Sequence, residues 1–233
     1  MTFADELKLN AIEIWNNILT HKFINEISMG SLPLNKFVFY LRQDHIFLKG
    51  FCNFLQNAKQ KCEVEGNYII KESFDGLYNS TINLEMEMQN QLLQSVVGIS
   101  SLDDDINNNN PFETATKPNK ITLEYTSYLM YVSSNGRLYE IISAMAPCPW
   151  SYFEIAKKLL SNKRQRYIKN EVYRKWIEFY SSYQSFKQVE DIKEILNVLS
   201  QNTCENGKKI MKNHFNTACK YEYNFWEISY YSF

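Results

Sequence analysis

The segment LNKFVFYLRQDHIFLKGFCNFLQNAKQKC, residues 34–62, decides the fold class of this chain. Pro33 directly precedes the segment, and proline is tolerated at the start of a helix but not in its interior. The large apolar side chains recur at intervals of three and four residues, as on one face of an α-helix: Phe37, Tyr40, Leu41, Leu48, Phe51 and Leu55. The segment therefore predicts one long helix from about Leu34 to Cys62.

The rest of the chain shows the same helical spacing. Only 7 Gly and 5 Pro occur in 233 residues, and a sheet protein needs more turn-forming residues than that. After a Thr2 cap we expect helices over about 3–18, 21–30, 66–93, 121–134, 137–145, 149–161, 168–182, 186–200 and 205–231. No internal repeat is evident. The sequence predicts an all-α fold, a single-domain helical bundle over residues 1–233.

Bulk composition limits the partners and the compartment. The chain has 25 Lys and Arg against 26 Asp and Glu, so it has no basic field, and we expect neither nucleic acid nor a membrane as partner. No apolar run reaches about 18 residues, and residues 1–15 lack the apolar core of a signal peptide. The five cysteines are irregularly spaced, which predicts mostly reduced thiols in a cytoplasmic protein, with one bridging pair left open.

The tract 103–110 differs from the rest of the chain because it consists almost entirely of Asp and Asn. It lies inside a stretch, 98–120, that also contains two prolines. Such composition predicts a solvated loop, and it assigns no binding role to the tract.

Two carboxylates lie in apolar helical stripes, where packing alone would not put them. Asp44 shares a face with Phe37, Tyr40 and Phe51, and Glu222 shares one with Phe225. Because a buried carboxylate is costly unless it is paired, Asp44 either accepts hydrogen bonds from a structural neighbour or meets a ligand. Burial would raise the pKa of Glu222, which suits a proton donor near neutral pH; pairing with a buried Tyr or Arg is the structural alternative.

Cys148 lies between two prolines in APCPWSY, residues 146–152. Pro149 fits the first position of a helix, so we expect Cys148 near the N-cap. Free N–H groups and the helix dipole lower the pKa of a thiol there, although an inert buried cysteine is the common alternative. Tyr125, Tyr152 and Tyr180 lie on other apolar helix faces, where a ring usually belongs to the core.

Several separate segments together resemble one family, thiaminase II (TenA). They are FVFYLRQDHIFL (37–48), LEYTSYL (123–129), APCPWSY (146–152), EVYRKWIEFY (171–180) and KYEYNFWEISY (220–230). The resemblance spans nearly the whole chain and rests on the combination of these segments. It implies a helical bundle of the haem-oxygenase-like kind that assembles as a homotetramer.

The resemblance also implies an activity and residue roles. Members hydrolyse 4-amino-5-aminomethyl-2-methylpyrimidine to the hydroxymethyl pyrimidine, and thiamin more slowly, without a metal or organic cofactor. Cys148 corresponds to the nucleophile, Glu222 to the proton shuttle and Asp44 to the residue that holds the aminopyrimidine. The pocket aromatics correspond to Tyr125, Tyr152, Tyr180 and Phe225. Cys148 places the chain in the cysteine-containing branch of the family.

One position departs from the family pattern, because Phe47 stands where a tyrosine is usual. The ring can still pack against a pyrimidine, but the lost hydroxyl is worth about 1 kcal/mol if it bonded the pocket. Tyr40, one turn before Asp44, offers a hydroxyl that could replace it.

Two alternatives stay open on the sequence alone. A non-catalytic pyrimidine-binding or regulatory protein on the same fold would be consistent with Phe47. A haem-oxygenase-like enzyme would need an axial histidine early in the chain, for which His21 is available. Di-iron chemistry is disfavoured because no histidine has a glutamate three residues before it.

Overall fold

The computed structural model describes residues 1–100, 117–161 and 170–232, with the side chains of 97–100 left out. Every regular element within these ranges is helical, as the sequence predicts. The elements are α1 (Phe3–Asn10), α2 (Ile12–Leu19), α3 (Lys22–Met29), α4 (Leu34–Val64), α5 (Tyr68–Ser80), the π-helical η1 (Thr81–Glu85), α6 (Met86–Ser100), α7 (Lys120–Asn135), α8 (Leu138–Met145), α9 (Pro147–Ser161), α10 (Glu171–Tyr180), α11 (Tyr183–Gln201) and α12 (Glu205–Tyr231).

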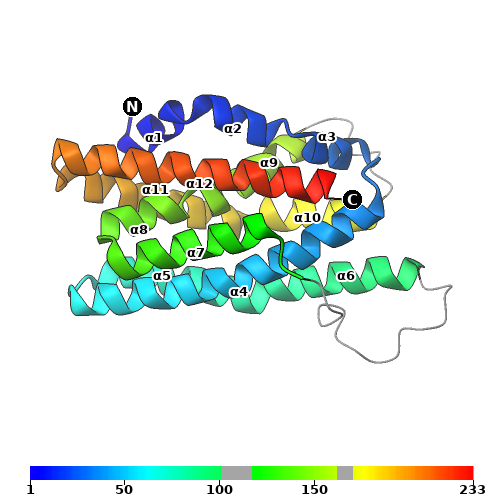
Figure 1. Ribbon diagram of the computed structural model, residues 1–233, viewed down its shortest axis with the longest axis horizontal. Helices are drawn as coiled ribbons and strands as arrows, with labels where there is room; N and C mark the ends of the chain where they lie inside the picture. The colour runs from blue at the N-terminus through cyan, green and yellow to red at the C-terminus, as the bar shows by residue number, and fades with distance from the viewer. Residues whose placement is uncertain (101–116, 162–169, 233) are drawn as a thin grey trace.

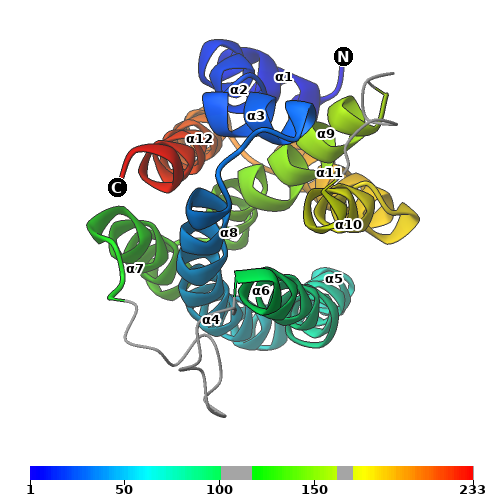
Figure 2. The same cartoon turned by 90° about the vertical axis from the view of Figure 1, so that its right-hand side faces the viewer.

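The long helices α4 and α12 run along the length of the molecule, and the short helices α1–α3 lie over α12 (Figure 1). Viewed along the bundle, α7 and α12 lie on one side and α10 on the other, with α9 between α12 and α10 (Figure 2). Helix α4 packs against both α7 and α5. Segments far apart in the sequence therefore meet at the centre, which is where the polar residues discussed below are found.

The long helix predicted for residues 34–62 is confirmed as α4, which has Pro33 as its N-cap. The large apolar side chains that predicted it are buried. Helix α3 ends at Gly30, as predicted, because Gly30 adopts φ 68°, a left-handed conformation that glycine reaches without strain.

Several helix boundaries differ from the prediction; for example, α9 begins at Pro147 instead of residue 149 and α11 at Tyr183 instead of residue 186. The helix expected over 3–18 is interrupted at Ala11, whose φ of −99° and ψ of 13° leave the helical region, so α1 and α2 are separate. The helix expected over 66–93 contains the π-helical turn η1 and continues to Ser100, because no residue before Gly98 breaks it. The loop predicted for 98–120 is therefore wrong at its start, and the Asp/Asn tract 103–110 lies outside the described residues.

All five cysteines are free thiols, which confirms the expectation of reduced cysteines and excludes the bridging pair from this structure. Among the described residues, no helix combines the length and apolar composition that a membrane-crossing segment requires.

Glu154 on α9 connects its own helix to the N-terminal helices α1 and α2. Its carboxylate accepts the indole N–H of Trp15 at 2.9 Å and that of Trp150 at 2.7 Å, and it pairs with Lys8 at 2.7 Å. Both indoles are buried, and their ring centroids lie 5.4 Å apart. Because buried N–H groups are costly without an acceptor, this carboxylate fixes how α2 packs on α9.

We expect Glu154→Gln to lower the free energy of unfolding by about 2 kcal/mol, because the amide keeps one acceptor oxygen and turns an N–H donor toward an indole N–H. Urea unfolding followed by circular dichroism measures this change. Glu178→Gln is the matched control, since Glu178 is exposed and lies 3.8 Å from Arg174. Its effect should stay within about 0.5 kcal/mol. Equal midpoints for the two variants would refute the role assigned to Glu154.

Candidate active site

Two adjoining cavities lie at the centre of the bundle and share Asp44, Cys148 and Tyr152 in their walls. The inner cavity, of about 180 Å³, is lined by Asp44, Phe47, Tyr125, Cys148, Tyr152, Glu222 and Phe225. The outer cavity, of about 660 Å³ with its open mouth, includes Tyr180 and Glu85 in its wall. The residues singled out from the sequence therefore come together around one space.

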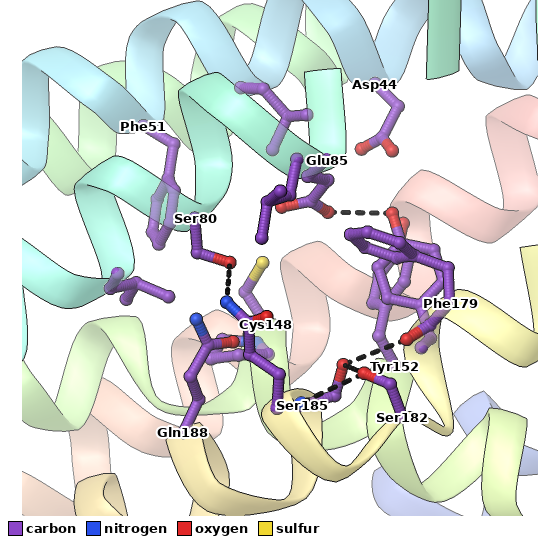
Figure 3. Close-up of a pocket in the computed structure, with 16 residues that line it drawn as sticks. Asp44, Phe51, Ser80, Glu85, Cys148, Tyr152, Phe179, Ser182, Ser185 and Gln188 are labelled. Atoms are coloured by element: carbon purple, nitrogen blue, oxygen red, sulfur yellow. Dashed lines mark hydrogen bonds between the residues drawn. The ribbon is translucent and has the colours of Figure 1, made fainter. Parts of the chain in front are cut away.

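Five helices contribute these residues. Asp44 and Phe47 lie on α4, Tyr125 on α7, Cys148 and Tyr152 on α9, Tyr180 on α10, and Glu222 and Phe225 on α12. Each side chain points inward because it shares a helix face with large core residues, so the register that builds the core also builds the site. A close-up shows Asp44, Glu85, Cys148 and Tyr152 around the outer cavity (Figure 3).

Asp44 is buried, and the hydrogen bonds that it accepts from described residues all fall on one oxygen. Its Oδ2 accepts from the Tyr40 hydroxyl at 3.0 Å and from the amide of Gln89. Trp176 in turn donates its indole N–H to the Tyr40 oxygen at 3.0 Å. Burial raises the pKa of Asp44 well above its usual range, the charge of Glu85 adds to this effect, and the bond from Tyr40 opposes it.

Glu222 is the second buried carboxylate, and it contacts both Tyr125 and Cys148. The Tyr125 hydroxyl donates to Oε1 at 2.7 Å, and Cys148 lies beside Glu222 in the wall of the inner cavity. Burial raises the pKa of Glu222 to about 7, with the hydrogen bond from Tyr125 and the nearby Cys148 thiol opposing the rise. The raised pKa expected from the sequence is thus present, and the buried tyrosine partner that was the structural alternative is present as well.

The position of Cys148 differs from the prediction. Helix α9 begins at Pro147, so Cys148 is its second residue, not its N-cap. Ala146 before it keeps helical angles, φ −54° and ψ −39°, and its carbonyl accepts from the Trp150 N–H at 3.3 Å. The chain therefore passes from α8 into α9 almost without a break, and little helix-terminal charge acts on the sulfur.

The predicted lowering of the Cys148 pKa is also wrong. Burial raises the pKa of the thiol well above its usual range, and the charges of Glu222, Glu85 and Asp44 raise it further. Negative charge near a thiol disfavours the thiolate, since both ions would share one poorly solvated space. At rest Cys148 is therefore a neutral thiol beside a carboxylate that can accept its proton.

Aromatic rings form the walls of the inner cavity. The Phe47 ring lies 4.8 Å from that of Tyr125 and 6.1 Å from that of Phe225, measured between centroids. On the side facing the outer cavity, the rings of Tyr152 and Tyr180 are 4.9 Å apart. Flat apolar walls with carboxylates at the edges suit a planar heteroaromatic ligand that carries hydrogen-bond donors.

Sequence reasoning missed Glu85 and Gln89. Glu85 ends the π-helical turn η1, and Tyr180 donates its hydroxyl to Oε1 at 2.7 Å; burial raises the pKa of Glu85 to about 7. Thr81, Glu85 and Gln89 follow Leu77 at four-residue intervals; Thr81 and Gln89 are buried and Glu85 is half-buried. The four-residue spacing was the signal in the sequence that these residues share one helix face. Because all three positions on that face are polar, the face did not look buried.

His21 lies outside both cavities, at the N-cap of α3. Its Nδ1 accepts the Phe23 N–H at 3.1 Å, and its Nε2 lies 3.0 Å from Glu227. Because an axial haem ligand needs a ring nitrogen with its lone pair available, this arrangement does not support His21 in that role. Over residues 1–100, 117–161 and 170–232, no cluster of three or more His, Cys, Asp or Glu is placed to hold a metal ion.

Several known proteins are similar to this chain in sequence or in fold. An aminopyrimidine aminohydrolase from Halalkalibacterium halodurans is 30% identical over 99% of this chain and 96% of its own length. The solved structure of a TenA homologue from P. horikoshii OT3 superposes with a TM-score of 0.83 at 26% identity, covering 99% of both chains. A haem oxygenase from Leptospira interrogans shares the fold, with a TM-score of 0.60 at 15% identity over 97% of this chain and 98% of its own.

These likenesses confirm the all-α, haem-oxygenase-like fold predicted from the sequence. The sequence profile of one family matches residues 10–232, which include every residue of the two cavities named above. The chain therefore belongs to the TENA/THI-4/PQQC family.

Proposed function

We propose that this chain is a thiamin-salvage hydrolase that converts 4-amino-5-aminomethyl-2-methylpyrimidine to the 5-hydroxymethyl pyrimidine, with slower cleavage of thiamin. One observation carries the proposal: a thiol, Cys148, and a carboxylate, Glu222, line the same aromatic cavity, and burial raises the pKa of that carboxylate to about 7. The relative from Halalkalibacterium halodurans, which matches nearly the whole chain, is named for this reaction.

Asp44 is the residue that orients the pyrimidine in this proposal. Its Oδ2 is occupied by Tyr40 and Gln89, and Oδ1 receives no hydrogen bond from another described residue. The exocyclic amino group or a protonated ring nitrogen of the substrate would donate to Oδ1. A charge-assisted bond of this kind fixes the ring and draws electron density from it, which prepares the ring for addition of a nucleophile.

Covalent addition is the step that Cys148 supplies. Direct displacement of an amine from the methylene carbon is slow because the amine is a poor leaving group. When the sulfur forms a bond to the electron-poor ring, the electron pair placed on the ring expels the amine from the methylene carbon. Water then adds to the methylene carbon, and the carbon–sulfur bond breaks to restore the aromatic ring. Two moderate barriers thereby replace one high barrier.

Glu222 carries the protons in this sequence. As the carbon–sulfur bond forms, the thiol proton passes to Glu222. The substrate amine, which is protonated at neutral pH, leaves as ammonia, and Glu222 then gives its proton to that ammonia. The regenerated carboxylate accepts a proton from the attacking water, and the sulfur recovers that proton when it leaves the ring. A pKa of about 7 allows both directions of transfer near neutral pH.

A pyrimidine-binding protein without turnover is the second candidate. Phe47 favours it, because the ring contacts Tyr125 and Phe225 but brings no hydroxyl to the cavity. Tyr40 does not replace that hydroxyl toward a ligand, since its own hydroxyl donates to Asp44. The reaction above uses no group from position 47, so we assign Phe47 to ring packing and expect turnover to be retained.

The homotetramer and the cytoplasmic location implied by the family resemblance stay predictions for this chain. Sedimentation equilibrium of the purified protein tests the assembly, and fluorescence microscopy of a tagged chain tests the location.

Cys148→Ser should lower turnover of the aminomethyl pyrimidine by about 1,000-fold or more, because an alcohol is a far weaker nucleophile toward the ring than a thiol. Liquid chromatography of the product, with the wild type and Cys204→Ser beside it, measures the loss. Cys204 is exposed and lies outside both cavities, so Cys204→Ser should keep wild-type turnover. A Cys148→Ser protein with wild-type turnover would refute covalent catalysis, and a wild type that binds without turnover would favour the second candidate.

The kcat of the wild type should rise with pH through about 7 and then level off, because only the ionised form of Glu222 accepts the thiol proton. Below that pH the raised pKa keeps Glu222 protonated, so the base is missing. Glu222→Gln should lower kcat by about 100-fold or more and remove this rise. Glu87→Gln, at an exposed glutamate, is the control. A pH profile of Glu222→Gln parallel to that of the wild type would exclude Glu222 as the proton carrier.

A further inference from the structure

Glu85 is a carboxylate of the cavity that the reaction above leaves without a role. It lines the outer cavity together with Asp44 and Cys148. Its Oε1 accepts the Tyr180 hydroxyl at 2.7 Å, while Oε2 receives no hydrogen bond from another described residue. Figure 3 shows the Glu85 carboxylate and the Cys148 sulfur turned toward the same space. One oxygen of Glu85 is therefore available to a ligand held beside the nucleophile.

Among the described residues, no lysine, arginine or histidine lies in the wall of this cavity. Apart from Asp44 and Cys148, the other polar side chains there are amides and hydroxyls, and some bond one another, such as Ser182 with Ser185 at 3.0 Å. A carboxylate in such surroundings is costly unless a counter-charge reaches it. The ligand is the remaining source of that counter-charge.

The neighbouring acids strengthen this requirement. The charge of Glu85 raises the pKa of Asp44, of Glu222 and of the Cys148 thiol, so the groups disfavour one another's ionisation. A cation placed among them relieves the repulsion and favours the ionised form of each. The π-helical turn η1 that ends at Glu85 is a departure from regular helix of the kind found at functional sites.

We propose that Glu85, held by Tyr180, binds the positively charged group on the methylene carbon of the substrate and so selects cationic over neutral substituents at that position. This inference rests on the proposed function above, and it adds a specificity-determining residue to it. An alkylamine is protonated at neutral pH, as the lysine side chain with a pKa of roughly 10 shows. The hydroxyl of the product is neutral.

With this role for Glu85, the substrate and the product bind with different affinities. The substrate ammonium binds the Glu85 carboxylate, whereas the hydroxymethyl product offers only a neutral hydrogen bond. The ammonia released from the methylene carbon accepts the proton held on Glu222 and leaves as ammonium through the outer cavity. Loss of the charged group therefore weakens binding of the product relative to the substrate, which favours product release.

Binding of a matched pair of ligands tests the inference. The aminomethyl and hydroxymethyl pyrimidines are nearly equal in size and differ in charge at neutral pH. Titration calorimetry on Cys148→Ser, compared with Cys148→Ser/Glu85→Gln, gives both dissociation constants without turnover. We expect Glu85→Gln to weaken binding of the amine by about tenfold or more, since hydrogen bonds to charged groups exceed neutral ones by about that factor. Binding of the alcohol should change by less than about twofold.

Two further variants separate charge from packing. Glu87→Gln, an identical exchange at an exposed position two residues away, should change neither constant. Glu85→Asp keeps the charge on a shorter side chain and should retain a preference for the amine. Equal weakening of both ligands by Glu85→Gln, unchanged affinity for the amine, or a Glu85→Asp protein without amine preference would each overturn the inference.

The same experiment keeps this inference distinct from the proposed function. If the wild type makes no hydroxymethyl pyrimidine, the hydrolase proposal fails, while a selective loss of amine affinity in Glu85→Gln still establishes the cation subsite. If the wild type turns over and Glu85→Gln weakens both ligands equally, the subsite fails and the hydrolase stands. Binding of neither ligand would overturn both.

Discussion

Burial of several carboxylates around one thiol is the constraint on which the structure depends. Each acid receives a hydrogen bond from a different tyrosine: Tyr40 donates to Asp44, Tyr180 to Glu85 and Tyr125 to Glu222. Phenol hydroxyls partly satisfy the oxygens without neutralising them, so the pKa of every one of these acids stays raised by burial. A salt bridge to arginine would have lowered those pKa values and removed the proton carrier.

The same arrangement explains how a nucleophile can be buried beside acids. A thiolate at rest would face the charges of Glu222, Glu85 and Asp44, all of which raise the pKa of Cys148. In the proposed reaction, the thiol therefore stays neutral until a substrate ring is present and Glu222 takes the proton. Because thiolates are the forms that oxidise readily, a neutral thiol also resists side reactions while the site is empty. In this scheme the reactive thiolate forms by proton transfer to Glu222 only in the complex with substrate, and the free protein does not hold a thiolate.

The helical spacing of apolar residues predicted most of the fold, because the apolar face of each helix is also the face that packs in the core. The face of α4 that contains Phe37 and Phe51 is an example, and Asp44 was visible on it as the polar exception. The electrostatics of Cys148 were not predictable, since they depend on Glu85 and Glu222, which arrive from distant helices. The two prolines suggested a helix start, but Ala146 keeps the helix going, and no local rule reveals that.

The relation to haem oxygenase shows why the fold alone does not assign the chemistry. The bundle superposes on a haem oxygenase with a TM-score of 0.60, yet His21 here has both ring nitrogens engaged and lies away from the cavities. The space between the helices is instead closed by aromatic rings and edged by acids, with Tyr152 and Tyr180 in contact where the two cavities meet. A bundle offers a central volume that many helix faces can line, so the side chains of those faces, and not the fold, set what the volume binds. In the proposed reaction, the acids that edge this volume hold an aminopyrimidine.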